Sequence, residues 1–139
     1  MKVFLVEDSK AVRERLRGML ANIPDIELVA EADNEEEAIQ GIYSFLPDVV
    51  ILDLTLAAGS GMGVLRRIRL QPLILRVIVL TNFTSPKYRE KCVELGADYF
   101  LDKTHEISEF EALLIQMSGS LKTKLMPPSS LLTHGYQDG

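Results

Sequence analysis

Five short apolar runs alternate along the chain with segments whose apolar residues recur at helical spacing. The runs occupy residues 3–6, 26–32, 48–54, 75–81 and 97–101. Three of them place Val, Ile and Leu at consecutive positions, which is typical of strands that helices cover on both faces. We therefore predict five buried β-strands, each followed by a helix.

The segments between the runs carry signals for helix starts. Ser9 and Asn34 are residue types that favour the N-cap position, and Ser85 precedes a proline that suits the first turn of a helix. Behind Ser9, one helical face collects the apolar residues Val12, Leu16, Met19 and Ile23. Strand and helix alternating five times predict an α/β fold with a doubly wound, parallel (βα)5 sheet and right-handed crossovers.

The strand and helix pattern ends near residue 118. From Ser118 onward the sequence SGSLKTKLMPPSSLLTHGYQDG has no periodicity, and its Pro127-Pro128 pair stops a helix from continuing. A chain of 139 residues is expected to form one domain. We predict that domain over residues 1–118 and a flexible or loosely docked tail over residues 119–139, too short for a DNA-binding domain.

Composition narrows the class of protein and partner. The formal net charge of -5 disfavours direct nucleic-acid binding, because neutralising phosphates needs a concentrated basic patch. The single cysteine, Cys92, excludes an internal disulfide and a multi-cysteine metal site. No apolar run approaches the roughly 18 residues that span a membrane, and MKVFLVEDSK does not resemble a signal peptide. We expect a cytoplasmic protein with no membrane partner.

Polar side chains gather at the predicted carboxyl ends of the strands. They are Glu7-Asp8 after the first strand, Asp53 near the end of the third, Thr81-Asn82 at the end of the fourth and Lys103 after the fifth. In a doubly wound sheet, ligands bind outside this edge, where the strand order reverses. We therefore expect these side chains to converge on one site.

The chemistry of this set favours a phosphoryl group and a metal ion. Three clustered carboxylates repel one another unless a cation lies between them. Mg2+ is the expected cation because it is small and hard, and binds a few protein oxygens together with water. The Lys103 ammonium adds positive charge and Thr81 adds a hydroxyl donor. Such a set suits a transferred phosphoryl group, whose charge the metal and the ammonium offset.

Each of these residues also has an ordinary structural explanation when taken alone. Asp53 could be a turn or helix-cap residue, and Glu7-Asp8 could be an acidic helix start. Thr81 could simply favour the strand, and Lys103 could be a solvated surface lysine. Their joint occurrence at the ends of the correct strands favours the functional interpretation.

Four stretches resemble the receiver domain of two-component response regulators. They are VFLVEDS, DVVILDL, VIVLT and GADYFLDK, and the resemblance extends from about residue 1 to residue 118. Each motif is weak alone, whereas the ordered set at these spacings is specific. The resemblance implies a stand-alone receiver with a flavodoxin-like fold and the strand order 2-1-3-4-5.

The resemblance implies that Asp53 is the phosphoacceptor. Asp53 would receive phosphate from the phosphohistidine of a sensor histidine kinase or a histidine phosphotransfer protein. Glu7 and Asp8 match the acidic pair that holds Mg2+ together with Asp53 and the backbone carbonyl of Thr55. The domain would then be a phosphoprotein that promotes its own phosphorylation and dephosphorylation, and not an enzyme acting on a separate substrate.

The resemblance also implies a switch. Lys103 matches the lysine that pairs with phosphate, and Thr81 matches the hydroxyl that turns toward the acyl phosphate. Phe100 stands at the aromatic switch position, where an ordinary core or half-buried strand aromatic would look the same in sequence. Phosphorylation would bias a pre-existing two-state surface and so change binding to a downstream protein.

Three positions depart from the family pattern. Ala57 replaces a proline in the loop after Asp53, whereas the glycine that opens the next helix is kept as Gly61. Thr104 replaces the proline that follows the lysine across a cis peptide bond. Asn82 stands where a small residue is usual, and its bulk would narrow access to the acyl phosphate. We expect differences from the relatives in loop shape and phosphorylation kinetics.

Other interpretations compete with a phosphorylated receiver. An aspartyl-nucleophile phosphatase of the dehalogenase type would carry Asp-x-Asp-x-Thr, but Thr55 occupies the position of the general acid. A flavodoxin-like nucleotide binder would need a phosphate-binding loop after the first strand, where EDSKAVRER is acidic. The intact Asp53 and Lys103 disfavour a degenerate receiver acting as a phosphorylation-independent interaction module. The chain could also be a fragment of a longer regulator.

Overall fold

The computed structural model describes residues 1–123, in which five strands alternate with five helices. The strands are β1 (Lys2–Val6), β2 (Glu27–Ala32), β3 (Val49–Leu52), β4 (Arg76–Thr81) and β5 (Tyr99–Asp102). The helices are α1 (Lys10–Ala21), α2 (Glu35–Phe45), α3 (Gly61–Ile68), α4 (Pro86–Glu94) and α5 (Ile107–Thr123). Every predicted strand is present, with small shifts at its ends.

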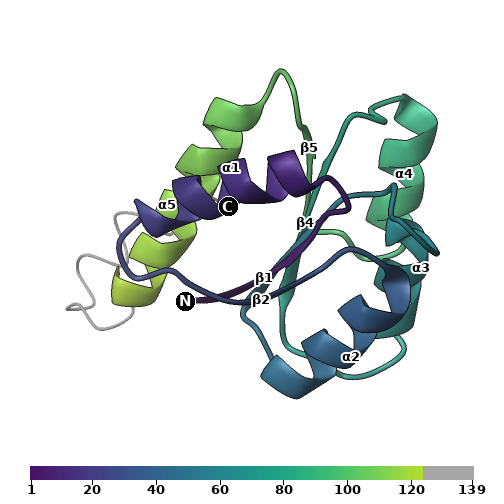
Figure 1. Ribbon diagram of the computed structural model, residues 1–139, viewed down its shortest axis with the longest axis horizontal. Coiled ribbons are helices and arrows are strands. Elements are labelled where there is room, and N and C mark those ends of the chain that lie inside the picture. Colours follow the sequence, from purple (N-terminus) through teal and green to yellow (C-terminus); the bar gives the residue numbers. More distant parts are fainter. Residues whose placement is uncertain (124–139) are drawn as a thin grey trace.

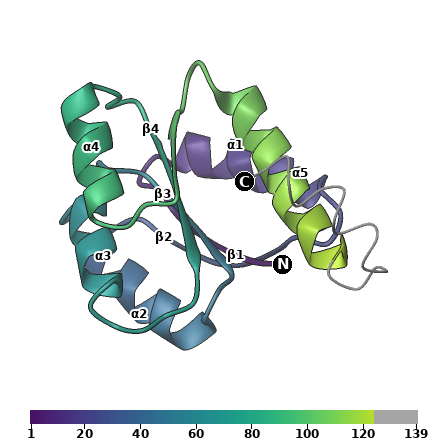
Figure 2. The ribbon, with the colours of Figure 1, turned by 180° about the vertical axis from the view of Figure 1, so that it is seen from behind.

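The strands form one parallel sheet in the order β2-β1-β3-β4-β5. α1 and α5 cover one face of the sheet, and α2, α3 and α4 cover the other (Figure 1). Figure 2 shows the same division from behind. This doubly wound, flavodoxin-like arrangement confirms the predicted fold and strand order. Because the strand order reverses between β1 and β3, the crevice beyond their carboxyl ends is the expected ligand site.

Alternate residues of each central strand enter two separate cores. In β3, Val50 and Leu52 belong to the cluster under α2, α3 and α4, whereas Val49 and Ile51 belong to the cluster under α1 and α5. All four are at most 1% exposed. Burial on both faces explains the consecutive apolar residues of these strands. All four positions of β3 are thus taken up by the two cores, and the first charged side chain, that of Asp53, comes directly after its last residue.

Capping residues define where the helices begin behind the strands. Ser9 and Asn34 each accept a hydrogen bond from the backbone N–H three residues later, at 3.3 and 3.0 Å, as predicted. Ser60, a cap that the sequence pattern did not predict, accepts the corresponding bond in α3 at 3.0 Å. Ser85 precedes α4 without a side-chain cap bond, and Pro86 occupies the first turn, where its missing N–H costs nothing.

The last helix, α5, runs through Thr123 and so continues past the boundary predicted at residue 118. The Ser and Gly residues of this stretch lower helix propensity but do not stop a helix that earlier turns have nucleated. The remainder of the predicted tail, with Pro127-Pro128, lies outside the described residues. Within residues 1–123, no helix combines the length and the apolar character needed to cross a membrane.

Candidate functional site

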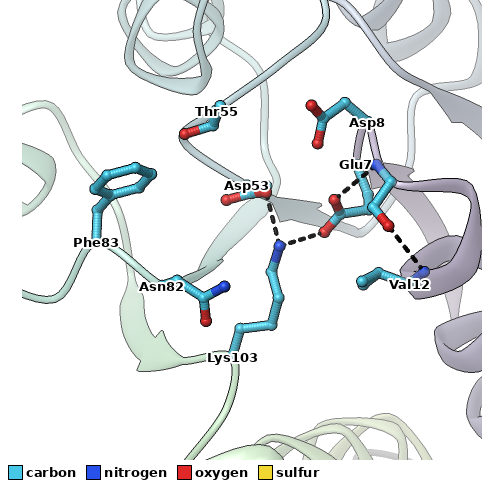
Figure 3. Close-up of a pocket in the computed structure, with 9 residues that line it drawn as sticks. Glu7, Asp8, Val12, Asp53, Thr55, Asn82, Phe83 and Lys103 are labelled. Carbon is cyan, nitrogen blue, oxygen red and sulfur yellow. Dashed lines mark hydrogen bonds and ion pairs between the residues drawn. The ribbon is translucent and has the colours of Figure 1, made fainter.

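The carboxyl ends of β1, β3 and β5 bring predicted site residues together. The backbone amides of Glu7, Asp53 and Lys103 each donate to the last residue of a neighbouring strand, at 3.0, 3.0 and 2.9 Å. These bonds continue the parallel ladders one residue past the strands, so the sheet holds the backbone beneath each functional side chain. Figure 3 shows the three side chains pointing toward one another at a common cavity.

The Lys103 ammonium bridges two carboxylates. Its Nζ lies 2.7 Å from Asp53 Oδ2 and 2.7 Å from Glu7 Oε1 (Figure 3). The residues Lys103, Glu7 and Asp53 are only 8%, 2% and 6% exposed, so water and salt screen these ion pairs weakly. The other oxygen of each carboxylate accepts a hydrogen bond from a backbone N–H. Asp53 Oδ1 accepts from Leu54 at 2.7 Å, and Glu7 Oε2 accepts from Ser9 at 3.0 Å. Both carboxylates are thus paired and oriented, as buried charges require.

Burial and neighbouring charges act in opposite directions on the pKa values of Glu7 and Lys103. Burial raises the pKa of Glu7 above its ordinary value, and the hydrogen bonds from Lys103 and Ser9 offset only part of that rise. Burial alone would lower the pKa of Lys103, but the carboxylates of Asp53 and Glu7 outweigh it and raise that pKa. Lys103 is therefore charged at neutral pH. With Asp8, the site holds three carboxyl groups and one ammonium, and this excess of acidic groups favours a cation.

Oxygen ligands for such a cation lie close together. One oxygen from each of Glu7, Asp8 and Asp53 lies within 4.8 Å of the others. Arg13 donates to the backbone carbonyls of Glu7 and Asp8, at 2.8 and 3.2 Å, and so holds the acidic segment in place. Hard carboxylate oxygens beside an open cavity fit Mg2+, which binds a few protein oxygens and keeps several waters. No sequence motif marked Arg13.

The residues line a cavity of about 350 Å³, here called the strand-end cavity. Its lining consists of Glu7, Asp8, Ser9, Val12, Asp53, Thr55, Asn82, Phe83 and Lys103. Ser9, Val12 and Phe83 are additions to the predicted site residues. The first two lie where α1 starts directly behind the acidic pair. Phe83 follows the end of β4 by two positions, and it is 47% exposed.

Thr81 lies at the predicted strand end but is not among the residues that line the strand-end cavity. The residue is fully buried, and its Oγ1 accepts a hydrogen bond from the backbone N–H of Phe83 at 3.1 Å. A hydroxyl that accepts this bond still has one proton to donate. The structure therefore brings the carboxylates of Glu7 and Asp53 into contact with Lys103, whereas the Thr81 hydroxyl is bonded to the backbone of Phe83.

Phe100 is a core residue in this structure. It is 6% exposed and belongs to the cluster under α2, α3 and α4. The β4–β5 register pairs Val79 with Phe100 and Thr81 with Asp102. Side chains alternate along a strand, so Phe100 and Thr81 share one face of the sheet. Arg89 of α4 lies over the Phe100 ring, with its Cζ 4.8 Å from the ring centroid, and links that helix to the predicted aromatic position.

The turn after Lys103 is built without a proline. Residues 1–123 contain no cis peptide bond, so the Lys103–Thr104 bond is trans. Asp102 holds this turn, because its Oδ1 accepts from the backbone N–H groups of Thr104 and His105 at 2.7 and 2.8 Å. Asn82, the bulky residue after Thr81, lines the strand-end cavity beside the Lys103 side chain (Figure 3).

The loop between β3 and α3 folds back tightly over Asp53. Gly61 N donates to Leu54 O at 3.0 Å, and Thr55 pairs with Ser60 across the loop. A Cβ atom on Gly61 would collide with the backbone carbonyl of Asp53, which explains why glycine opens α3. This tight return keeps Thr55 in the lining of the strand-end cavity.

Comparison with known proteins agrees with this geometry. The family model of the response regulator receiver domain matches residues 3–115. Since the match covers most of the chain, this protein belongs to the receiver domain family of response regulators. The family predicted from the sequence motifs is confirmed.

Individual relatives are moderately similar. The chain is 32% identical over 109 residues to the uncharacterized transcriptional regulatory protein YvfU of Bacillus subtilis, across 78% of this chain and 54% of that protein. It is 33% identical over 103 residues to the DNA-binding transcriptional activator DevR/DosR of Mycobacterium tuberculosis, across 74% of this chain and 48% of that protein. The solved structure of a DNA-binding response regulator of the LuxR family from Staphylococcus aureus matches with a TM-score of 0.77 and 30% identity. The match covers 84% of this chain and 98% of that chain. The chain spans about half the length of the curated relatives it matches.

Proposed function

We propose that this receiver domain accepts a phosphoryl group on Asp53 in a Mg2+-dependent transfer. The observation that carries the proposal is the Lys103 ammonium, 2.7 Å from both the Asp53 and the Glu7 carboxylate at the strand-end cavity. An ammonium in this position neutralises Asp53 and can pair with the oxygens of an incoming phosphoryl group. Such a preorganised positive charge is what phosphoryl transfer requires.

Asp53 is the nucleophile in this proposal. One of its carboxylate oxygens attacks the phosphorus of a phosphohistidine on a sensor histidine kinase or a histidine phosphotransfer protein. The O–P bond forms as the P–N bond breaks, and the imidazole nitrogen leaves with that electron pair and takes up a proton. The Leu54 N–H, 2.7 Å from Oδ1, holds the carboxylate in one orientation, so little rearrangement precedes the attack.

The acidic residues hold the metal ion in this proposal. Glu7, Asp8 and Asp53 supply carboxylate oxygens that already lie within 4.8 Å of one another, and the Thr55 backbone carbonyl is a further ligand. A bound Mg2+ supplies positive charge for the phosphoryl oxygens. Glu7 has a second role, since its Oε1 orients the Lys103 ammonium toward Asp53.

Thr81 and Phe100 convert the new charge into a change of surface. The Thr81 hydroxyl turns toward the acyl phosphate, and Phe100 on the same sheet face follows this movement. Arg89 over the Phe100 ring carries the change to α4. A downstream protein then reads the shifted population of two surface states. We propose that the chain acts in the cytoplasm and signals through protein contacts. Its net charge of -5 does not favour a nucleic-acid surface.

Incubation with acetyl phosphate and Mg2+, beside the Asp53→Ala variant, tests this function. We expect intact-protein mass spectrometry to show one acid-stable, base-labile phosphoryl group on the unmutated chain and none on the variant. Chelating Mg2+ should abolish labelling. Equal labelling of both chains, or no labelling even with the cognate kinase, would overturn the assignment of Asp53.

A further inference from the structure

We propose that Glu35, the first residue of α2, positions the β3–α3 loop and through it the metal-binding end of the site. This inference rests on the proposed function. The loop, residues 54–60, directly follows Asp53, contains Ala57, Ala58 and Gly59, and has no proline. A loop without proline has more conformations to lose on folding, so other contacts have to hold it. The start of α2 supplies them.

Hydrogen bonds tie the loop to the start of α2 at three places. The backbone N–H of Glu35 donates to Ala58 O at 3.0 Å. The side-chain Oε1 of Glu35 accepts from Ser60 N at 3.1 Å. The backbone carbonyl of Asp33, two residues earlier, accepts from Ala57 N at 2.9 Å. The loop backbone is therefore paired with a neighbouring element and does not depend on its own turn alone.

The Glu35 carboxylate is itself held in a single position. Arg67 of α3 lies 3.1 Å from its Oε2, and the Glu35 side chain is 21% exposed. A Cβ atom on Gly63 would collide with the Glu35 carboxylate, so glycine at this place in α3 leaves the space that the carboxylate occupies. Arg67 also pairs with Glu36 at 2.5 Å, but the Glu36 side chain is 68% exposed. Glu35 is thus packed between the loop and α3, while Glu36 lies outside.

A short path connects Glu35 to the strand-end cavity. Ser60, which donates to Glu35, pairs across the loop with Thr55. Thr55 lines the cavity, and its backbone carbonyl is the proposed further ligand of Mg2+. Groups that orient metal ligands without touching the metal typically change metal affinity by about 10–100-fold. Glu35 is therefore a positioning residue, which acts on the metal site through the loop.

Adjacent residues provide the variants for a test. Glu35→Ala removes the acceptor of Ser60 N, whereas Glu35→Gln keeps an oxygen that can accept the same bond. Glu36→Ala is the matched control, because it removes a partner of the same Arg67 and does not touch the loop. Thermal melts without Mg2+ identify any variant that is simply less stable.

Calorimetric Mg2+ titration and acetyl phosphate labelling over a range of Mg2+ concentrations measure the effect. We expect Glu35→Ala to bind Mg2+ about tenfold more weakly and to need correspondingly more Mg2+ for half-maximal labelling. Its maximal labelling rate at saturating Mg2+ should stay within about twofold of the unmutated chain, because the reacting groups are intact. Glu36→Ala should resemble the unmutated chain in both measurements. Glu35→Gln keeps the acceptor of Ser60 N but loses the carboxylate oxygen that pairs with Arg67, so it should fall between Glu35→Ala and the unmutated chain.

Amide hydrogen exchange adds a readout that needs neither metal nor phosphate. The Ala57 and Ser60 amides should exchange faster in Glu35→Ala than in Glu36→Ala. Three results would overturn the inference and leave the proposed function standing. They are unchanged exchange of the Ala57 and Ser60 amides in Glu35→Ala, an unchanged Mg2+ affinity of that variant, and an equal loss of affinity in Glu36→Ala. If the unmutated chain itself neither binds Mg2+ nor becomes labelled, the proposed function fails and the link from Glu35 to a metal fails with it.

Discussion

The hydroxyl of Thr104 donates a hydrogen bond to Oδ1 of Asn82 at 2.9 Å. Thr104 follows β5 and Asn82 follows β4, so the bond joins two loops at the carboxyl edge of the sheet. Asn82 lines the strand-end cavity. Two residues that are 22 positions apart in the sequence thus form one structural unit at the rim of the site.

Removing this hydrogen bond should speed the labelling of Asp53. In Thr104→Val the Asn82 amide loses the bond that holds it at the cavity rim, so a small phosphodonor has easier access. A hydrogen bond worth about 0.5–1 kcal/mol corresponds to a rate increase of about two- to fivefold with acetyl phosphate. Thr104→Ser, which retains the hydroxyl, should leave the rate unchanged.

A double-mutant cycle tests the same coupling. Asn82→Ala removes both the hydrogen bond and the bulk of the side chain, so it should accelerate labelling at least as much as Thr104→Val. The double variant should be no faster than Asn82→Ala alone, because Thr104 then has no Asn82 side chain to hold. Intact-protein mass spectrometry at fixed Mg2+ gives the rates. Additive effects of the two changes would mean that the residues act independently.

Removal of the Lys103 ammonium should destabilise the fold in a pH-dependent manner. Lys103→Met leaves the buried carboxyl groups of Asp53 and Glu7 without their shared cation, and the loss of unfolding free energy should reach about 3–5 kcal/mol near pH 8 without Mg2+. The loss should shrink toward pH 5, since protonation removes the repulsion between the carboxylates. Urea denaturation at both pH values measures it. The exposed Lys87→Met is the control, and a deficit that does not depend on pH would argue against the ion pairs as the cause.

Mg2+ binding should strengthen as the pH rises. Burial raises the pKa of Glu7, so its carboxyl group takes up a proton at a higher pH than an ordinary glutamate does. A carboxyl group must lose its proton before it binds Mg2+, so affinity increases as the pH passes upward through the raised pKa. Calorimetric titration at several pH values measures this change. Glu7→Gln should bind more weakly with a flatter pH dependence, and an unchanged profile in that variant would exclude Glu7 as the cause.

Asp102 should stabilise the chain most at neutral pH. The backbone N–H of His105, helped by that of Thr104, lowers the pKa of the Asp102 carboxyl group below its ordinary value. A lowered carboxyl pKa adds stability above the unfolded-state pKa, and this stability is lost as the pH falls through the folded-state value. Asp102→Asn should therefore lower the Tm at neutral pH, and the difference should shrink as the pH falls through the lowered folded-state pKa of Asp102. Thermal melts of the variant and the unmutated chain, beside the exposed Glu109→Gln, measure the difference.

Local sequence determined the elements and the residues at their ends. The consecutive apolar residues Val49–Leu52 predict a strand that is buried on both faces. This prediction needs only the apolar character of each residue, without knowledge of its partners. Asp53 directly after this strand and Lys103 directly after β5 are likewise visible without tertiary contacts. The alternation of such strands with helices then restricts the topology to a parallel, doubly wound sheet, and the ordered motifs specify its family.

Tertiary structure decided which of these residues touch one another. Lys103 contacts Asp53, which is 50 positions away in the sequence. Thr81 is equally close to a strand end, but its hydroxyl oxygen accepts a hydrogen bond from the backbone N–H of Phe83. The place of Phe100 in the core depends in the same way on packing between elements. So does the contact of Glu35 with the loop after Asp53, which no local pattern marks. Periodicity and capping are properties of neighbouring residues, but side-chain orientation at a strand end is selected by partners distant in the chain, and only the folded structure brings those partners together.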